Sequence, residues 1–205
     1  MGEHRIDTIE QLEALYGQPG KPSLVKEVGH VTSHYCAFIE ASPFLALASV
    51  GEEGLDCSPR GDAPGFVRVQ DEKTVLVPDR RGNNRIDTLR NIIRDPRVSL
   101  LFLIPGIGET LRINGRAEIS ADPALLHSFA VDGKAPRSVL VVTVESIYFL
   151  CQKALVRSKL WDPSTRIERS ALPSTGRMLQ ELSREAFDGD AYDRAYPERL
   201  KQTIY

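Results

Sequence analysis

The residues best suited to chemistry are gathered in one segment, VPDRRGNNRIDTLRNI at residues 77–92. Apolar residues recur at helical spacing from Ile86 onward, so the segment predicts a loop that opens a helix. Such a loop presents unpaired backbone N–H groups at the positive end of the helix dipole, and arginine side chains add donors that fit phosphate oxygens. The polar residues of this loop are Asp79, Arg80, Arg81, Gly82, Asn83, Asn84 and Arg85.

This loop predicts a phosphate site in which Asn83 or Asn84 caps the helix. A solvated surface loop with an ordinary N-cap is the alternative, and the segment alone does not decide between them. Three other segments favour the phosphate site. Each has polar residues on one face: Ser58, Arg60 and Asp62 in CSPRGD; Thr110, Arg112 and Asn114 in TLRING; and Lys153, Arg157, Ser158 and Trp161 in CQKALVRSKLW. Together the four segments predict a composite site for an anionic ligand.

The overall composition limits the kinds of partner. The chain has 205 residues and a formal net charge of −2, so there is no global electrostatic case for nucleic acid or an anionic membrane. No apolar run approaches the roughly 20 residues of a membrane span, and the first residues lack the apolar segment of a signal peptide. The three cysteines suggest neither a disulfide framework nor a zinc site. We therefore expect a cytoplasmic protein without a structural metal.

The hydrophobic pattern predicts helices at both ends and strands between them. We expect an N-terminal helical segment over residues 1–43, a barrel domain over 44–162 and a C-terminal helical extension over 163–205. Pro59 favours an edge strand, and Asp122 is expected to cap a helix. The predicted strands are 44–50, 55–60, 66–70, 74–78, 97–105, 109–120 and 138–150, and the predicted helices are 6–16, 30–41, 84–94, 121–130 and 174–187. Short turns without regular βαβ alternation indicate a mostly antiparallel barrel of the α+β class.

Residues 76–120, followed by CQKALVRSKLW at 151–161, resemble the FMN-binding region of the pyridoxamine 5′-phosphate oxidase-related family. The resemblance spans about residues 40–162 and is greatest to a bacterial branch with PDRRGNNR and CxKAxxRSxLW segments. It implies a mainly β fold with helices, the split β-barrel, assembled as a homodimer with FMN in clefts at the dimer interface.

The resemblance also implies roles for individual residues. Ser58, Arg60 and Asp62 would lie on a strand beside the flavin, and Pro78 to Arg85 would surround its phosphate and ring edge. Thr110 stands where classical oxidases have a glutamine that contacts the isoalloxazine. The polar residues and the tryptophan of the 151–161 segment would close the site from the partner subunit: Lys153, Arg157, Ser158 and Trp161.

The function implied is that of an FMN-dependent oxidoreductase acting on an unknown small molecule. The chain lacks the C-terminal Arg-Leu-His-Asp-Arg segment that classical oxidases use around the pyridoxal substrate, so vitamin B6 oxidation is not implied. Two alternatives remain open. One is a flavin binder or sensor without catalysis, and the other is a protein of the same fold that binds a deazaflavin or haem. Haem would need an axial ligand, and the four histidines lie outside the proposed site segments.

Overall fold

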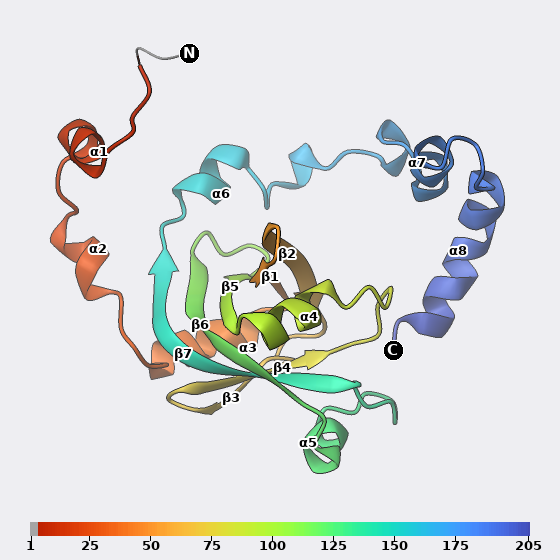
Figure 1. Cartoon of the computed structure of the whole chain (residues 1–205), viewed down its shortest axis with the longest axis horizontal. Coiled ribbons are helices and arrows are strands. Elements are labelled where there is room, and N and C mark those ends of the chain that lie inside the picture. Colours follow the sequence, from red (N-terminus) through yellow and green to blue (C-terminus); the bar gives the residue numbers. More distant parts are fainter. Residues whose placement is uncertain (1–3) are drawn as a thin grey trace.

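The computed structural model of the chain describes residues 4–205, and its centre is a seven-stranded sheet (Figure 1). The strands follow the spatial order β2-β1-β5-β6-β7-β4-β3, and every neighbouring pair is antiparallel. The strands are β1 (Phe44–Gly51), β2 (Gly54–Gly61), β3 (Arg68–Asp71), β4 (Thr74–Asp79), β5 (Arg97–Leu103), β6 (Thr110–Ser120) and β7 (Ser138–Leu150). The α+β split barrel expected from the sequence is thereby confirmed.

Alternating burial explains why these segments fold as strands. In β1, Leu45 and Leu47 are fully buried, while Ala46 between them is only partly covered. The same alternation places Leu100 of β5 and Ile113 of β6 in a large apolar core inside the sheet. Each such side chain contributes about 1.5–3 kcal/mol when it leaves water. A slip of one residue would turn these side chains outward, so the core fixes the register.

Eight α-helices are described in residues 4–205, and several begin or end away from their predicted positions. Residues 174–187 form α7 and a loop rather than one helix. The individual helices α2, α6 and α8 were not predicted, although α2 and α8 lie in the terminal segments that were expected to be helical. The first three residues of the expected N-terminal segment lie outside the described residues. The helices are α1 (Ile9–Tyr16), α2 (Lys21–Val25), α3 (Ser33–Ala41), α4 (Asp87–Arg94), α5 (Pro123–Ser128), α6 (Lys153–Ser158), α7 (Thr175–Leu182) and α8 (Gly189–Thr203). The Asp122 carboxylate caps α5 as predicted, and Pro59 lies in β2 at the edge of the sheet.

Helix α4 packs across β1 and β2 and connects the core to the polar loop before it. The hydroxyl of the buried Thr88 lies 3.3 Å from both the Asp56 carboxylate and the Ser58 hydroxyl, while the Asn91 amide donates to Ser49 at 3.1 Å. Buried polar groups of this kind need such partners. These contacts fix α4 relative to β1 and β2.

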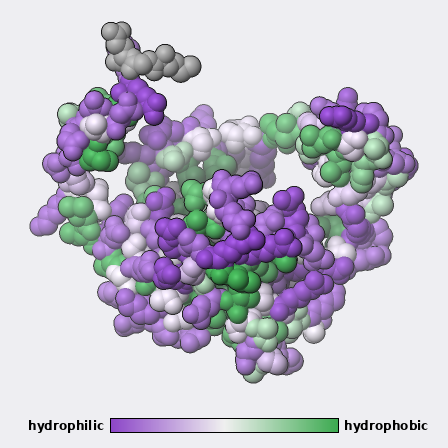
Figure 2. All heavy atoms as spheres, viewed as in Figure 1, coloured by the Kyte–Doolittle hydropathy of each residue, from purple (hydrophilic) through white to green (hydrophobic). Residues whose placement is uncertain are grey.

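The terminal helices extend from the barrel on two sides (Figure 1). α1 and α2 form one arm, and it leaves Ile9 and Leu15 about two-thirds exposed. α7 and α8 form the other arm and approach so closely that a Cβ on Gly176 would overlap the Gly189 carbonyl oxygen. Figure 2 shows apolar residues on the surface of both arms. Within residues 4–205, no helix is both long and apolar enough to cross a membrane.

Candidate functional site

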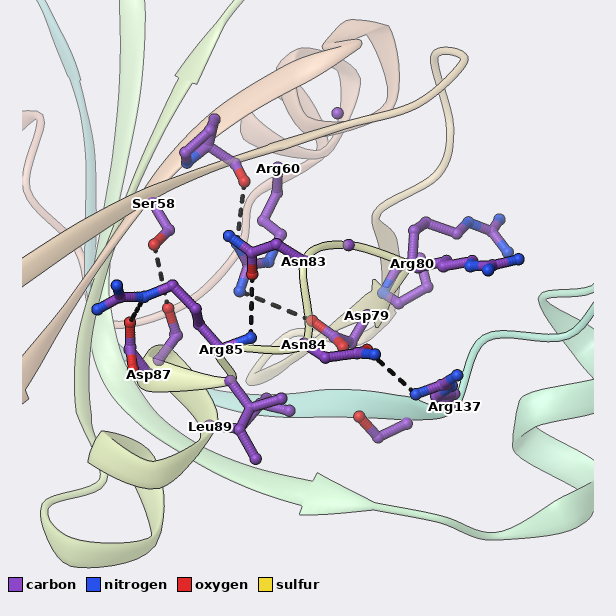
Figure 3. A pocket seen from close by; sticks show the side chains of 18 of the residues that line it. Ser58, Arg60, Asp79, Arg80, Asn83, Asn84, Arg85, Asp87, Leu89 and Arg137 are labelled. Carbon is purple, nitrogen blue, oxygen red and sulfur yellow. Dashed lines mark hydrogen bonds and ion pairs between the residues drawn. The ribbon is translucent and has the colours of Figure 1, made fainter. Parts of the chain in front are cut away.

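A polar pocket lies at the loop between β4 and α4 (Figure 3). Its volume is about 540 Å³, within the roughly 300–1,000 Å³ range of small-molecule sites. Its walls come from the end of β2, the end of β4, the loop itself, the first turn of α4 and the start of β7. The pocket therefore joins β2, the β4–α4 segment and β7, which are far apart in the sequence.

Strand pairing explains why these segments meet. β4 pairs with β7 so that Asp79 lies opposite Ser138, which brings the end of one strand beside the start of the other. The loop 80–86 then passes toward α4, which is bonded to β2 through Thr88. Figure 3 shows Asp79, Asn83 and Asn84 in the middle of the pocket. The sheet thus determines where the polar loop lies.

The prediction that Asn83 or Asn84 caps the helix is wrong. The Asn83 side-chain oxygen accepts from the Arg85 backbone N–H at 3.0 Å, and that of Asn84 accepts from Arg137 at 3.2 Å. The residue at the N-cap is Ile86, whose φ of 55° and ψ of 25° are left-handed and whose side chain cannot accept a hydrogen bond. Helix α4 therefore begins at Asp87 without a side-chain cap, and a β-branched residue occupies a conformation that costs about 1–3 kcal/mol.

The pocket carries an excess of positive charge. Three of its arginines are paired: Arg60 lies 3.6 Å from Asp79, while the two closer pairs are Arg80–Asp62 at 2.8 Å and Arg85–Asp87 at 2.7 Å. Within residues 4–205, the other two lining arginines, Arg81 and Arg137, form no ion pair. An anion is therefore favoured here although the whole chain is slightly acidic.

Two carboxyl groups in this region have opposite pKa shifts. Burial raises the pKa of Asp79, and the charges of Arg60 and Arg137 only partly offset that effect. Burial would also raise the pKa of Asp62, but hydrogen bonds from Tyr205, from a backbone N–H and from Arg80 together lower it below its ordinary value. Asp62 is thus a stable anion that holds Arg80, whereas the negative charge of Asp79 is disfavoured.

Two buried polar atoms of the lining have no partner within the described residues, Arg60 Nε and Ser138 Oγ. Most buried polar groups in proteins have a hydrogen-bond partner, so two buried polar atoms without one beside a cationic pocket need an explanation. Both atoms belong to residues that line the pocket, one on β2 and the other at the start of β7. The donor set therefore fits a ligand rich in acceptor oxygens, such as a phosphate ester.

Arg112 and Asn114 of β6 lie outside the pocket and donate to the hydroxyls of Tyr148 and Ser146 on β7. The other residues singled out in the sequence fall into two groups. One lines the pocket: Ser58, Arg60, Pro78, Asp79, Arg80, Arg81, Gly82, Asn83, Asn84 and Arg85. Asp62 lies outside the lining and binds Arg80. The other group lies at the opposite end of β7, where Thr110 pairs with Leu150. It contains the exposed Lys153, Arg157 and Ser158, and Trp161, whose indole N–H donates to the Ile107 carbonyl at 2.8 Å.

Sequence reasoning missed Arg137, Ser138 and Phe66 in the lining. It also missed Tyr205, whose hydroxyl donates to Asp62 at 2.7 Å across 143 positions of sequence. Arg137 immediately precedes β7, and Ser138 is the first residue of that strand. Only the pairing of β4 with β7 brings these two residues to the polar loop. No local pattern marks them as site residues.

Comparison with solved structures gives distant likenesses. HupZ from Group A Streptococcus is 20% identical, with 59% of this chain and 94% of that chain covered and a TM-score of 0.48. A protein from Clostridium acetobutylicum related to general stress protein 26, of the pyridoxinephosphate oxidase family, is 16% identical, with 56% and 84% covered and a TM-score of 0.43. A FAD-binding protein from Mesorhizobium loti is 16% identical, with 58% and 93% covered and a TM-score of 0.41.

No curated protein sequence matches the chain. The sequence profile described as pyridoxamine 5′-phosphate oxidase matches residues 31–151, which is more than half of the chain and spans from β1 to β7. The protein therefore belongs to the pyridoxamine 5′-phosphate oxidase family.

Proposed function

We propose that the pocket binds a flavin, as FMN, and that the protein is an oxidoreductase acting on a small molecule. The observation that carries this proposal is the unpaired positive charge of Arg81 and Arg137 beside the uncapped start of α4. Family membership supports a flavin as the source of the phosphate. Within residues 4–205 the lining contains no histidine, cysteine, methionine or tyrosine, so the donor set does not favour the haem alternative.

The lining residues would have different roles in binding the flavin. Arg81 and Arg137 would neutralise the phosphate, and the free N–H groups of the first turn of α4 would donate to its oxygens. Arg85 is held by Asp87, and Arg80 by Asp62, so these two arginines would shape the loop. Ser58 and Arg60 of β2 would face the remainder of the ligand across the pocket.

A bound flavin supplies the electron-transfer chemistry, and the protein needs to hold it, orient a substrate and limit the access of water. The absence of a paired acid and base among the lining residues is therefore no objection to catalysis. The substrate and the electron donor are not specified by these residues. We place the flavin-binding domain at residues 44–162 and regard residues 1–43 and 163–205 as extensions of it.

We also propose that the functional unit is a homodimer in which α6 of one subunit closes the pocket of the other. Two features support this arrangement: α6 presents Lys153 and Arg157 to solvent, and Val156 on the same helix is 61% exposed. In one chain they lie at the wrong end of β7 to contact the pocket. Ser158, Trp161 and Thr110 belong to the same end and would be brought over with them.

Intersubunit complementation tests this proposal. Arg81→Ala and Lys153→Ala should each weaken FMN binding in their own homodimers. Two affinity tags allow the heterodimer of the two variants to be purified. One of its sites then carries both substitutions and the other carries neither, so about one FMN per heterodimer should bind with wild-type affinity. A Lys153→Ala homodimer with wild-type affinity, or a heterodimer that binds no better than its parents, would contradict the shared site.

A further inference from the structure

A second, smaller pocket shares part of its wall with the proposed flavin site. Its volume is about 160 Å³, and it shares Arg80, Arg81 and Arg137 with the larger pocket. The rest of its wall is formed by Lys134, Ala135, Pro136 and Tyr205. The two pockets therefore have three arginines in common, and only the smaller one includes Lys134.

The charges of this pocket favour an anion. Arg80 is neutralised by Asp62, but within residues 4–205 neither Arg81 nor Lys134 forms an ion pair, and Arg137 bonds only to the neutral Asn84. Besides Asp62, two acids act on this region through space: Asp79 acts on Arg137, and Asp132 acts on Tyr205. The positive charges outnumber the negative ones, so a bound anion would relieve their mutual repulsion.

The walls of the pocket are held in place by contacts of their own. Lys134 ends a tight turn in which it exchanges two backbone hydrogen bonds with Val131, and Asp132 and Gly133 have the positive φ values of 49° and 77° that this turn needs. The Tyr205 hydroxyl is bonded to Asp62, and its ring lies 5.6 Å from the Arg80 guanidinium. The backbone that carries Lys134 and the position of Tyr205 are thus fixed by contacts within the described residues.

The size of the pocket defines what it can take. A volume of 160 Å³ is well below the roughly 300–1,000 Å³ of sites that enclose a whole small ligand. A small anionic group attached to a ligand in the neighbouring pocket fits both the volume and the charge. We propose that this pocket, defined by Arg81, Lys134, Arg137 and Tyr205, binds a second phosphate beside the phosphate of the flavin.

This inference rests on the proposed flavin site and extends it to the ligand class. The second phosphate has two sources with the same chemistry. It belongs either to the diphosphate of a flavin dinucleotide or to a separate phosphorylated substrate that enters after FMN. In both cases Lys134 contacts the second phosphate only, whereas Arg81 serves both.

The test compares wild-type protein with Lys134→Ala and with Lys201→Ala, a control that removes the same charge from an exposed position of α8. Flavin-free protein is titrated with FMN and with FAD, and FMN-loaded protein is titrated with inorganic pyrophosphate. Lys134→Ala should leave FMN affinity unchanged. It should weaken either FAD or pyrophosphate binding about tenfold, which corresponds to one charge-assisted contact. Lys201→Ala should change none of these affinities.

The result identifies the source of the phosphate. A loss confined to FAD indicates a flavin dinucleotide, and a loss confined to pyrophosphate on the FMN-loaded protein indicates a separate phosphorylated ligand. The inference is overturned if Lys134→Ala alters neither affinity, or if it weakens FMN as much as Arg81→Ala does. Failure of wild-type protein to bind FMN or FAD would instead refute the proposed function.

Discussion

Arg80 and Arg81 are adjacent in the sequence, yet their surroundings give them different roles. The Arg80 side chain is 15% exposed and donates to Asp62 and to the Phe129 carbonyl, each at 2.8 Å. Arg80→Ala removes both charge-assisted bonds and leaves Asp62, whose side chain is 4% exposed, with only Tyr205 and a backbone N–H. We expect the free energy of unfolding to fall by about 2–4 kcal/mol, which lowers the Tm of a chain of this size by roughly 4–16 °C.

Arg81 is exposed and makes no ion pair within residues 4–205, so Arg81→Ala should change stability by less than about 0.5 kcal/mol. In the proposed site the same substitution removes a phosphate contact of about 1.5–3 kcal/mol, a loss of roughly 10- to 150-fold in FMN affinity. Urea unfolding and flavin fluorescence titration of both variants measure the two quantities. Equal unfolding free energies for the two variants, or unchanged FMN affinity in Arg81→Ala, would refute this assignment of roles.

Three further predictions concern the loop and its supporting acids. The folded-state pKa of Asp79 is raised above 3.8, so the folded protein loses stability as pH rises through that pKa. The Asp79→Asn variant should therefore unfold at a higher urea concentration than wild type at pH 7. Below about pH 3.8 the two proteins should unfold at the same urea concentration. The depressed pKa of Asp62 contributes stability that is present above about pH 4 and lost as pH falls through the folded pKa. Tyr205→Phe should lower the free energy of unfolding at pH 7 and should make its further fall at acidic pH smaller. If the variant loses as much stability at acidic pH as wild type does, Tyr205 does not act on Asp62. Ile86→Gly should raise the free energy of unfolding by roughly 1 kcal/mol in a calorimetric comparison, because glycine removes the cost of the left-handed conformation; a lower Tm would contradict that account.

Local features of the fold could be predicted from the sequence. The Asp122 cap of α5 and the limits of β7 follow from residues that are neighbours in the chain, and the structure has them as expected. The N-cap of α4 was predicted wrongly for an equally local reason. Asparagine side chains bond readily to nearby groups, and those of Asn83 and Asn84 bond to Arg85 and Arg137 instead of to the helix.

Long-range features of the candidate site could not be predicted. Arg137 joins the lining because β4 pairs with β7, and about sixty residues separate the two strands. Tyr205 reaches Asp62 from the other end of the chain. The hydrophobic pattern of a strand shows that it is buried but does not name its neighbour, so these contacts appear only once the sheet order is known. The sequence motifs therefore located the polar loop, and the topology supplied the remaining walls.

The central claim is that the cationic pocket beside α4 holds a flavin. The most direct measurement is the absorbance spectrum of the purified protein, with the released ligand identified by its mass. The account predicts flavin absorption bands and a ligand mass that matches FMN, or FAD if the second phosphate pocket serves a dinucleotide. A colourless protein that stays colourless and binds nothing after incubation with either flavin would contradict it, and the roles proposed for Arg81, Arg137 and Lys153 would have to be abandoned.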